Sequence, residues 1–151
     1  MTVVAANGYA TLERRWQEGD VVELRLPMPA RLTAAHPRID ATRASVAIER
    51  GPLVYCLEQC DQEAGVDVLD VEIDERAPLK AVWREDLLGG VVAVEAQGQA
   101  LEPARLGLYV PLARLAEIPR RPARLVAIPY YAWANREPGA MRVWIPRQNL
   151  S

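Results

Sequence analysis

Several residue types are rare or missing in this chain of 151 residues. Phenylalanine is absent, His36 is the only histidine, Lys80 is the only lysine, and Cys56 and Cys60 are the only cysteines. Two cysteines are too few for a secreted fold held together by disulfides, and a closed zinc site needs four ligands. The composition therefore disfavours both a disulfide scaffold and a structural metal centre, and we expect no cofactor.

Neither a strong excess of one charge nor a long apolar run is present. The 18 basic and 20 acidic side chains give a net charge of −2, so the electrostatic footprint of a nucleic-acid-binding protein is missing. The apolar runs are short and interrupted by charged residues or proline, which excludes a membrane-spanning helix. Residues 1–8 lack the features of a secretory signal. We expect a cytoplasmic protein without nucleic-acid or membrane partners.

What the chain does contain is alternation of apolar and polar residues. A period of two residues is typical of strands with one face on a core. Turn residues such as Gly51-Pro52, Gly89-Gly90 and Pro138-Gly139 separate the alternating runs, and twelve prolines oppose long helices. We therefore predict an all-β fold, an antiparallel β-sandwich in one domain over 1–151. The alternating apolar positions are Val22, Leu24, Leu26, Val46, Ile48, Val92, Val94, Ala96, Val143 and Ile145.

Individual segments allow more specific predictions. Tyr9–Trp16 and Val21–Pro27 are expected to form a hairpin. The continuous apolar run Leu53–Leu57 predicts a strand buried on both faces. Leu112–Ile118, between two prolines, predicts a short helical turn. Arg120–Pro122 is expected to be a loop, and a polar stretch at 60–65 predicts a loop boundary.

Candidate catalytic and metal-binding residues are few. On one straight strand, Cys56 and Cys60 would lie about 13 Å apart, too far for a shared metal unless the strand bends after Leu57. His36 precedes Pro37 and is expected in an exposed connection. Two groups of carboxylates could be considered for sugar hydrolysis, but a solvated strand face explains them better. These groups are Asp67 with Asp70, and Glu72 with Asp74 and Glu75.

The aromatic group Tyr130, Tyr131 and Trp133 is the remaining candidate site. Exposed aromatic rings stack on sugars, but they also pack in cores or against neighbouring domains. If the segment is a strand, Tyr130 and Tyr131 point to opposite faces and cannot form one platform. We favour packing or docking for this group and keep sugar stacking as the alternative.

Several motifs in a fixed order give the chain a family resemblance. It resembles the C-terminal β-sandwich region of glycoside hydrolase family 127, the β-L-arabinofuranosidase-like proteins. Relative to that family, the chain looks truncated at its N-terminus. The motifs that carry the resemblance are Gly8–Arg14, Gly19–Leu24, Leu26–Pro29, Arg50–Glu58, Ile128–Arg136 and Met141–Pro146.

The resemblance implies that the catalytic residues belong to a different part of the protein. In that family, a helical barrel ahead of this region carries a cysteine nucleophile beside a zinc ion, whose ligands include an adjacent Cys-Cys pair. No such pair occurs in this sequence, so we assign no catalytic and no metal-binding residue and expect no glycosidase activity from this chain alone. We expect a non-catalytic accessory module that supports a catalytic barrel in cis or in trans. An autonomous carbohydrate-binding module is the alternative, and a homodimer is expected for the isolated chain.

Overall fold

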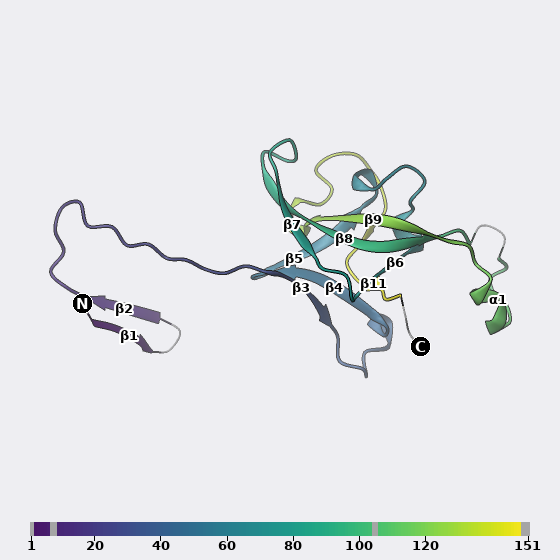
Figure 1. Cartoon of the computed structure of the whole chain (residues 1–151), viewed down its shortest axis with the longest axis horizontal. Coiled ribbons are helices and arrows are strands. Elements are labelled where there is room, and N and C mark those ends of the chain that lie inside the picture. Colours follow the sequence, from purple (N-terminus) through teal and green to yellow (C-terminus); the bar gives the residue numbers. More distant parts are fainter. Residues whose placement is uncertain (1, 7–8, 104–105, 149–151) are drawn as a thin grey trace.

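A curled antiparallel β-sheet dominates the computed structural model, which describes residues 2–6, 9–103 and 106–148 (Figure 1). Its main strands follow the order β11-β4-β5-β9-β8-β6, while β3 pairs with β4, β10 with β5, and β7 with β8. The strands are β3 (Ala30–Ala34), β4 (Ser45–Arg50), β5 (Leu53–Glu58), β6 (Val71–Ile73), β7 (Lys80–Arg84), β8 (Val91–Leu101), β9 (Arg120–Pro129), β10 (Met141–Arg142) and β11 (Ile145–Pro146).

The sheet curls far enough for its two ends to meet. Ile73 of β6 forms an isolated parallel bridge with Arg147, which directly follows β11. The backbone N–H of Gln148 donates to the carbonyl of Ile73 at 3.0 Å. The all-β, antiparallel prediction is confirmed, and the facing layers come from one continuous sheet that bends over on itself.

The main core lies inside this curl. Alternate residues of neighbouring strands point inward, including Tyr55 and Leu57 of β5 and Leu125 and Ala127 of β9. The hydroxyl of Tyr55 is satisfied by the carbonyl of Val92 at 2.9 Å. This pattern is what period-two alternation predicts for a sheet with one face on a core. The remaining buried members are Val46, Ile48, Val66, Val68, Val71, Ile73, Val94, Ala96, Ala100, Ala123 and Ile145.

A second, smaller cluster covers the outer face of β5 and β9. Cys56 and Ile128, which are paired in the ladder, point outward and are both buried. They are covered by Leu87 and Leu88 before β8, by Val91 at the start of β8, by Ala132, by Met141 of β10 and by Val143 after it. The prediction of a strand covered on both faces is therefore correct for Tyr55, Cys56 and Leu57, whereas Val54 is 40% exposed.

The turn between β4 and β5 shows why a glycine is needed there. Gly51 has a φ of +58°, a conformation that side chains with a Cβ rarely adopt. A Cβ on Gly51 would also lie 2.6 Å from Cε of Met28. The alternating residues Val46 and Ile48 lie in β4, and the predicted strand Leu53–Leu57 matches β5 except for its last residue.

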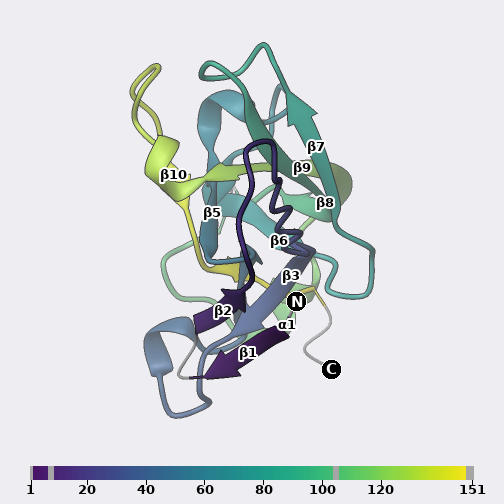
Figure 2. The same ribbon diagram turned by 90° about the vertical axis from the view of Figure 1, so that its left-hand side faces the viewer.

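The N-terminal part, residues 2–6 and 9–29, forms an arm that extends away from the curled sheet (Figures 1 and 2). In this N-terminal arm, β1 (Thr2–Ala6) pairs with β2 (Tyr9–Glu13), and an extended segment leads to β3. The predicted hairpin between Tyr9–Trp16 and Val21–Pro27 is thus wrong, because β2 pairs with β1 and residues 21–29 belong to no strand. Consequently Val22, Leu24 and Leu26 are exposed instead of facing a core.

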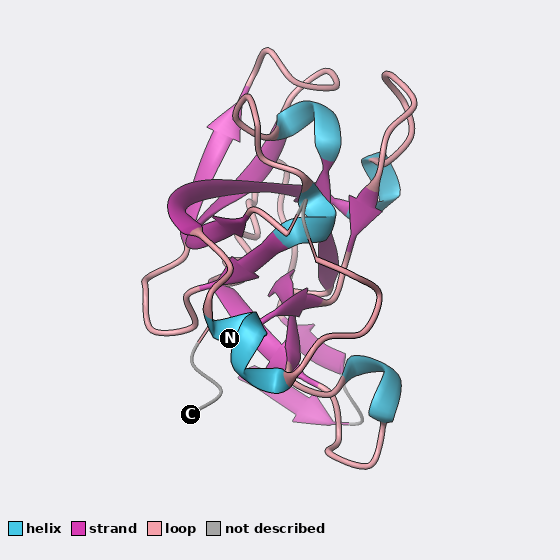
Figure 3. Ribbon diagram, turned by 90° about the vertical axis from the view of Figure 1, so that its right-hand side faces the viewer, coloured by secondary structure: helices cyan, strands magenta, loops and turns pink. Residues whose placement is uncertain are grey.

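Helical structure is limited to short turns (Figure 3). α1 (Leu112–Ala116) confirms the predicted turn, and the others are the 3-10 turns η1 (Asp40–Thr42), η2 (Gln59–Asp61), η3 (Val68–Asp70) and η4 (Tyr130–Ala132). Within the described ranges, no helix has the length and apolar composition needed to cross a membrane. Arg120–Pro122, expected to be a loop, instead opens β9, where it pairs with the end of β8.

Candidate functional site

The candidate site lies beside the end of β5, which runs antiparallel to β9 so that Tyr55 is opposite Pro129. β5 stops at Glu58 and continues into η2, and β9 stops at Pro129 and continues into η4. The chain then forms a loop over residues 133–140 and returns as β10, whose Met141 pairs with Glu58. Two turns and one loop therefore meet above the outer face of the sheet. We call residues 130–140 the aromatic loop.

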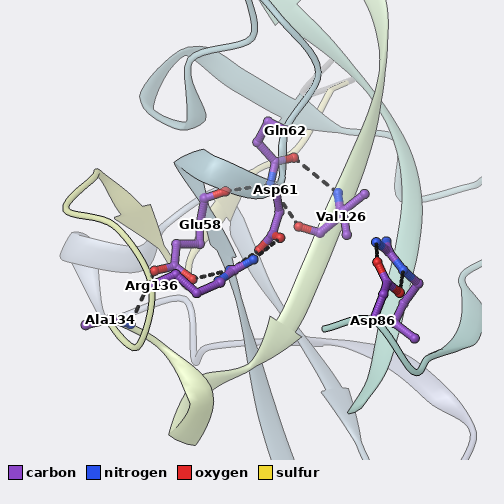
Figure 4. Close-up of polar contacts among 8 residues, drawn as sticks. Glu58, Asp61, Gln62, Asp86, Val126, Ala134 and Arg136 are labelled. Carbon is purple, nitrogen blue, oxygen red and sulfur yellow. Dashed lines mark hydrogen bonds and ion pairs between the residues drawn. The ribbon is translucent and has the colours of Figure 1, made fainter. Parts of the chain in front are cut away.

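A buried carboxylate anchors the aromatic loop. Glu58 is 1% exposed and is the only charged or polar residue in the described part of the chain that is classed as buried. Its Oε2 accepts from Nη2 of Arg136 at 2.5 Å, and its Oε1 accepts from the backbone N–H of Ala134 at 3.2 Å (Figure 4). A buried charge is costly unless it is paired and hydrogen-bonded, and both conditions are met here.

Asp61 supplies the second carboxylate of this group. Its two oxygens accept from Nη1 and Nη2 of Arg136 at 2.5 and 2.6 Å, which is a two-point contact of guanidinium with carboxylate (Figure 4). These hydrogen bonds, first to Asp61 and then to Glu58, raise the pKa of Arg136 well above its ordinary range. The guanidinium is therefore permanently charged, and it links η2 to the aromatic loop.

Beyond the end of β5, the side chain of a glutamine supplies the hydrogen bonds to the backbone of β9 that a longer strand would make. The Nε2 group of Gln62 donates to the carbonyl of Val126 at 2.9 Å, and its Oε1 accepts from the N–H of Val126 at 3.1 Å (Figure 4). Gln59 does the same for the next connection, with hydrogen bonds to Val66 and Val68. Buried backbone groups need such partners, so the two amides hold η2 and residues 62–70 in place.

The two cysteines occupy different environments. Cys56 is 1% exposed in the outer cluster, and burial, together with the charges of Glu58 and Asp61, raises the pKa of its thiol to about 12. Cys60 lies in η2, is partly exposed, and has a pKa raised mainly by burial. Both thiols are free. The strand does not bend after Leu57 but continues through Glu58, and the chain turns at η2.

That turn brings a different set of groups together. The ligand atoms of Glu58, Cys60 and Asp61 lie within 4.8 Å of one another, a spacing that could suit a metal ion. The guanidinium of Arg136, however, already contacts both carboxylates. A positive charge in this position neutralises the carboxylates that a cation would use, so the arrangement is explained as a structural ion-pair group.

The aromatic residues are arranged differently from the strand that we predicted. Tyr130 and Tyr131 belong to η4, and Trp133 follows directly after it. The rings of Tyr130 and Trp133 stack, with centroids 5.9 Å apart and planes inclined by 25°. The three side chains are 45%, 67% and 38% exposed. The opposite-face argument for Tyr130 and Tyr131 is therefore wrong, because it required a strand.

A shallow hollow adjoins Trp133. Its volume is about 380 Å³, and it is lined by Glu58, Trp133, Ala134, Arg136, Glu137, Pro138 and Gly139. The hollow thus combines the side chain of Trp133 with the charged group beneath the loop. Glu58, Asp61 and Arg136 were not among the residues selected from the sequence.

The other residues considered from the sequence do not assemble into a catalytic pair. Asp67 caps η3 by accepting from the N–H of Leu69 at 2.8 Å, and Asp74 accepts from the N–H of Arg76 at 2.9 Å. His36 is exposed, and its Nδ1 accepts from a backbone N–H at 3.2 Å. Glu72 binds Gln99, and Glu75 binds Arg147. Asp67, Glu72, Asp74 and Glu75 are thus each engaged in a local contact.

Comparison with known proteins places this fold in a family. The family model described as "Glycoside hydrolase family 127 C-terminal domain" matches residues 30–146, which is the curled sheet from β3 to β11. A non-reducing end beta-L-arabinofuranosidase from Bifidobacterium longum subsp. longum is 38% identical over 135 residues, covering 83% of this chain and 20% of the relative. The chain therefore spans about a fifth of the length of that relative.

Solved structures agree with this match. A GH127 beta-L-arabinofuranosidase from Geobacillus stearothermophilus T6 is 36% identical, with a TM-score of 0.69 over 81% of this chain and 19% of that one. A GH127 beta-arabinofuranosidase is 32% identical, with a TM-score of 0.80 over 98% of this chain and 22% of that one. The chain belongs to glycoside hydrolase family 127 and carries the C-terminal domain of that family.

Proposed function

We propose that this chain is a non-catalytic accessory module that docks through its N-terminal arm onto the rest of a β-L-arabinofuranosidase-type enzyme. The single observation that carries the proposal is the arm itself, which projects from the curled sheet (Figure 1) and leaves its apolar side chains exposed. Large contiguous apolar surfaces on soluble proteins mark interaction sites. The exposed apolar members are Tyr9, Trp16, Val21, Val22, Leu24 and Leu26.

The arm offers a shaped surface for a partner. A hollow of about 460 Å³ lies between β2 and the returning chain, and it is lined by Leu12, Trp16, Val22 and Leu24 among others. Arg14 sits over the Trp16 ring at 5.3 Å and pairs with Asp20 at 2.9 Å. Arg25 likewise pairs with Glu23 at 2.7 Å, so four of the charges of the arm are paired locally beside its exposed apolar side chains.

The backbone of the arm is also suited to docking. Residues 21–29 are extended but belong to no strand in the described structure, so their peptide groups can pair with a strand of another domain. A solved relative matches 98% of this chain, and this chain covers only 22% of it. That longer protein therefore has a counterpart of the arm together with much additional chain that could cover it.

Without such a partner, the same surface should bring two copies together. The homodimer expected from the sequence is part of this proposal, formed by mutual covering of the arms or by exchange of Tyr9–Trp16. Light scattering over a wide range of dilution tests it. A monomer at every concentration would contradict the dimer, and it would show that the isolated arm needs no cover.

The docking experiment uses the Bifidobacterium longum relative shortened by the fifth that this chain matches. We expect this chain to bind the shortened protein, and its dimer to dissociate on binding. Leu24→Asp should abolish the complex, because it places a charge on the apolar surface. Leu108→Asp is the matched control, since Leu108 is 99% exposed but lies outside the arm. Equal loss in both variants, or no complex at all, would overturn docking through the arm.

Catalysis is tested separately. We expect no turnover of an aryl β-L-arabinofuranoside by this chain with zinc and reductant present. Turnover that is lost in Cys56→Ser would show that the chain is itself an enzyme.

A further inference from the structure

We propose that the hollow beside Trp133 binds a neutral sugar ring. This site is separate from the N-terminal arm, and the proposal does not depend on docking. The volume of about 380 Å³ lies at the lower end of the range in which proteins bind small molecules. The lining combines an aromatic ring and small apolar groups with a few charged groups, the combination that fixes the orientation of a ligand.

The aromatic wall is preorganised for stacking. Trp133 is held by its stack on Tyr130, and the amide of Asn135 donates to the carbonyl of Trp133 at 3.2 Å. Trp133 nevertheless stays 38% exposed. The face of an indole ring is electron-rich and attracts groups with partial positive charge, such as the C–H groups on one face of a sugar. Because the ring is already positioned, little side-chain entropy is lost on binding.

The charges around the hollow select the chemical class of the ligand. Three carboxylates, Glu58, Asp61 and Glu137, lie at or beneath the hollow with one guanidinium, Arg136. The excess of negative charge disfavours carboxylates and phosphates. The pairing of Arg136 with Glu58 and Asp61 occupies both of its terminal nitrogens. Glu137 is exposed and has no assigned partner among the hydrogen bonds of the described residues, so it can accept from sugar hydroxyl groups.

The floor of the hollow is rigid. The ion pairs of Arg136 and the hydrogen bond from Ala134 to Glu58 tie the loop to η2. A Cβ on Gly139 would lie 3.2 Å from Cβ of Gln59, so the loop also packs closely at this point. A rigid, water-accessible hollow with an aromatic wall fits a polyhydroxylated ring better than a long flexible chain.

The experiment follows the indole N–H signals of the full chain by two-dimensional NMR. The probes are methyl glycosides of L-arabinofuranose, D-xylopyranose and D-glucopyranose, each titrated separately. We expect a saturable shift of the Trp133 signal with at least one glycoside, while the signals of Trp16 and Trp83 stay in place. Trp133→Ala should remove the binding, which in this variant is followed by the backbone N–H signals of Ala134 and Gly139 in the lining of the hollow. Trp83→Ala is the matched control, because Trp83 is 62% exposed on β7 and lies outside the hollow.

A second variant and a second class of ligand test the sugar site independently of Trp133→Ala. Glu137→Ala changes only an exposed carboxylate and should weaken binding at least several-fold if Trp133→Ala fails to fold. Tetramethylammonium tests the alternative that the acidic, aromatic hollow prefers a cation. A Trp133 shift with tetramethylammonium but with none of the glycosides would overturn sugar binding. So would a glycoside shift that survives in Glu137→Ala and is lost in Trp83→Ala.

Discussion

Arg136 reaches across 78 positions of sequence to place its Nη2 2.5 Å from Oε2 of Glu58, which is almost completely buried. Removing the guanidinium leaves that carboxylate buried without a counter-charge. Arg136→Ala should therefore lower the free energy of unfolding by about 3–5 kcal/mol, the usual cost of breaking a buried ion pair from one side. Urea unfolding measures this change.

The matched control for this substitution is Arg84→Ala. Arg84 also makes a two-point contact with a carboxylate, that of Asp86, at 2.9 and 2.7 Å, but on the exposed surface (Figure 4). Exposed ion pairs contribute little to stability, so this variant should unfold at nearly the same urea concentration as the unmodified chain. Equal destabilisation by the two substitutions would show that burial of Glu58 is not what makes its partner important.

The thiols of Cys56 and Cys60 should react with a disulfide reagent at different rates. Cys56 is 1% exposed and has a strongly raised pKa, whereas Cys60 is partly exposed. A bulky disulfide reagent should therefore modify Cys60 first and reach Cys56 only when the outer cluster opens. The Cys60→Ser variant isolates the slow thiol, and unfolding in urea should make it react fast. Rapid modification of Cys56 in the folded chain would contradict its burial.

The raised pKa of Cys56 also predicts a dependence of stability on pH. Burial raises that pKa from an ordinary value of 9.0 to about 12, so between these limits the unfolded chain loses a proton that the folded chain keeps. The contribution is fully present below pH 9 and is lost progressively as the pH rises toward 12. Cys56→Ala removes this dependence, and its free energy of unfolding should fall less steeply over that range. Parallel curves for the two chains would contradict the prediction.

Substitution of a glycine in the centre of the sheet should lower the stability of the fold. A Cβ added to Gly98 of β8 would lie 2.4 Å from the carbonyl oxygen of Glu72 and 2.8 Å from Cδ1 of Leu125. Gly98→Ala should therefore cost about 1–3 kcal/mol of stability through overpacking. Gly107→Ala is the control, since its nearest neighbour would be at an ordinary 3.7 Å. Thermal unfolding compares the two, and an unchanged midpoint for Gly98→Ala would contradict the close approach.

The spacing of apolar residues at every second position correctly predicted strands of the curled sheet. In the N-terminal arm the same pattern predicted a strand that does not form. Val46 and Ile48 occupy every second position in the same way as Val22 and Leu24, yet the first pair is buried and the second is exposed. Alternation reports that one face is apolar, but it does not identify what covers that face. For β4 the cover is other strands of this chain, and for residues 21–29 no covering strand lies within the described structure.

The candidate site was only partly predictable for a similar reason. Tyr130, Tyr131 and Trp133 are conspicuous in the sequence, but their geometry depends on β9 ending at Pro129. A glutamate at the end of the apolar run 53–57 was a usable signal, because a buried carboxylate requires a cation. The chain has 18 basic side chains, and no local pattern indicates that Arg136 is the one that folds back onto it.

The bridge between Ile73 and Arg147 has a consequence for how the chain acquires its structure. The two edges of the curled sheet are joined by residues that lie 74 positions apart, the later of them directly after β11. During synthesis, β3 to β9 can leave the ribosome while the seam between β6 and β11 is still missing. Folding should therefore complete late and comparatively slowly, as expected for contacts of long sequence separation. Nascent chains that stop before Ile145 should remain open and be cleaved by proteases that the finished domain resists.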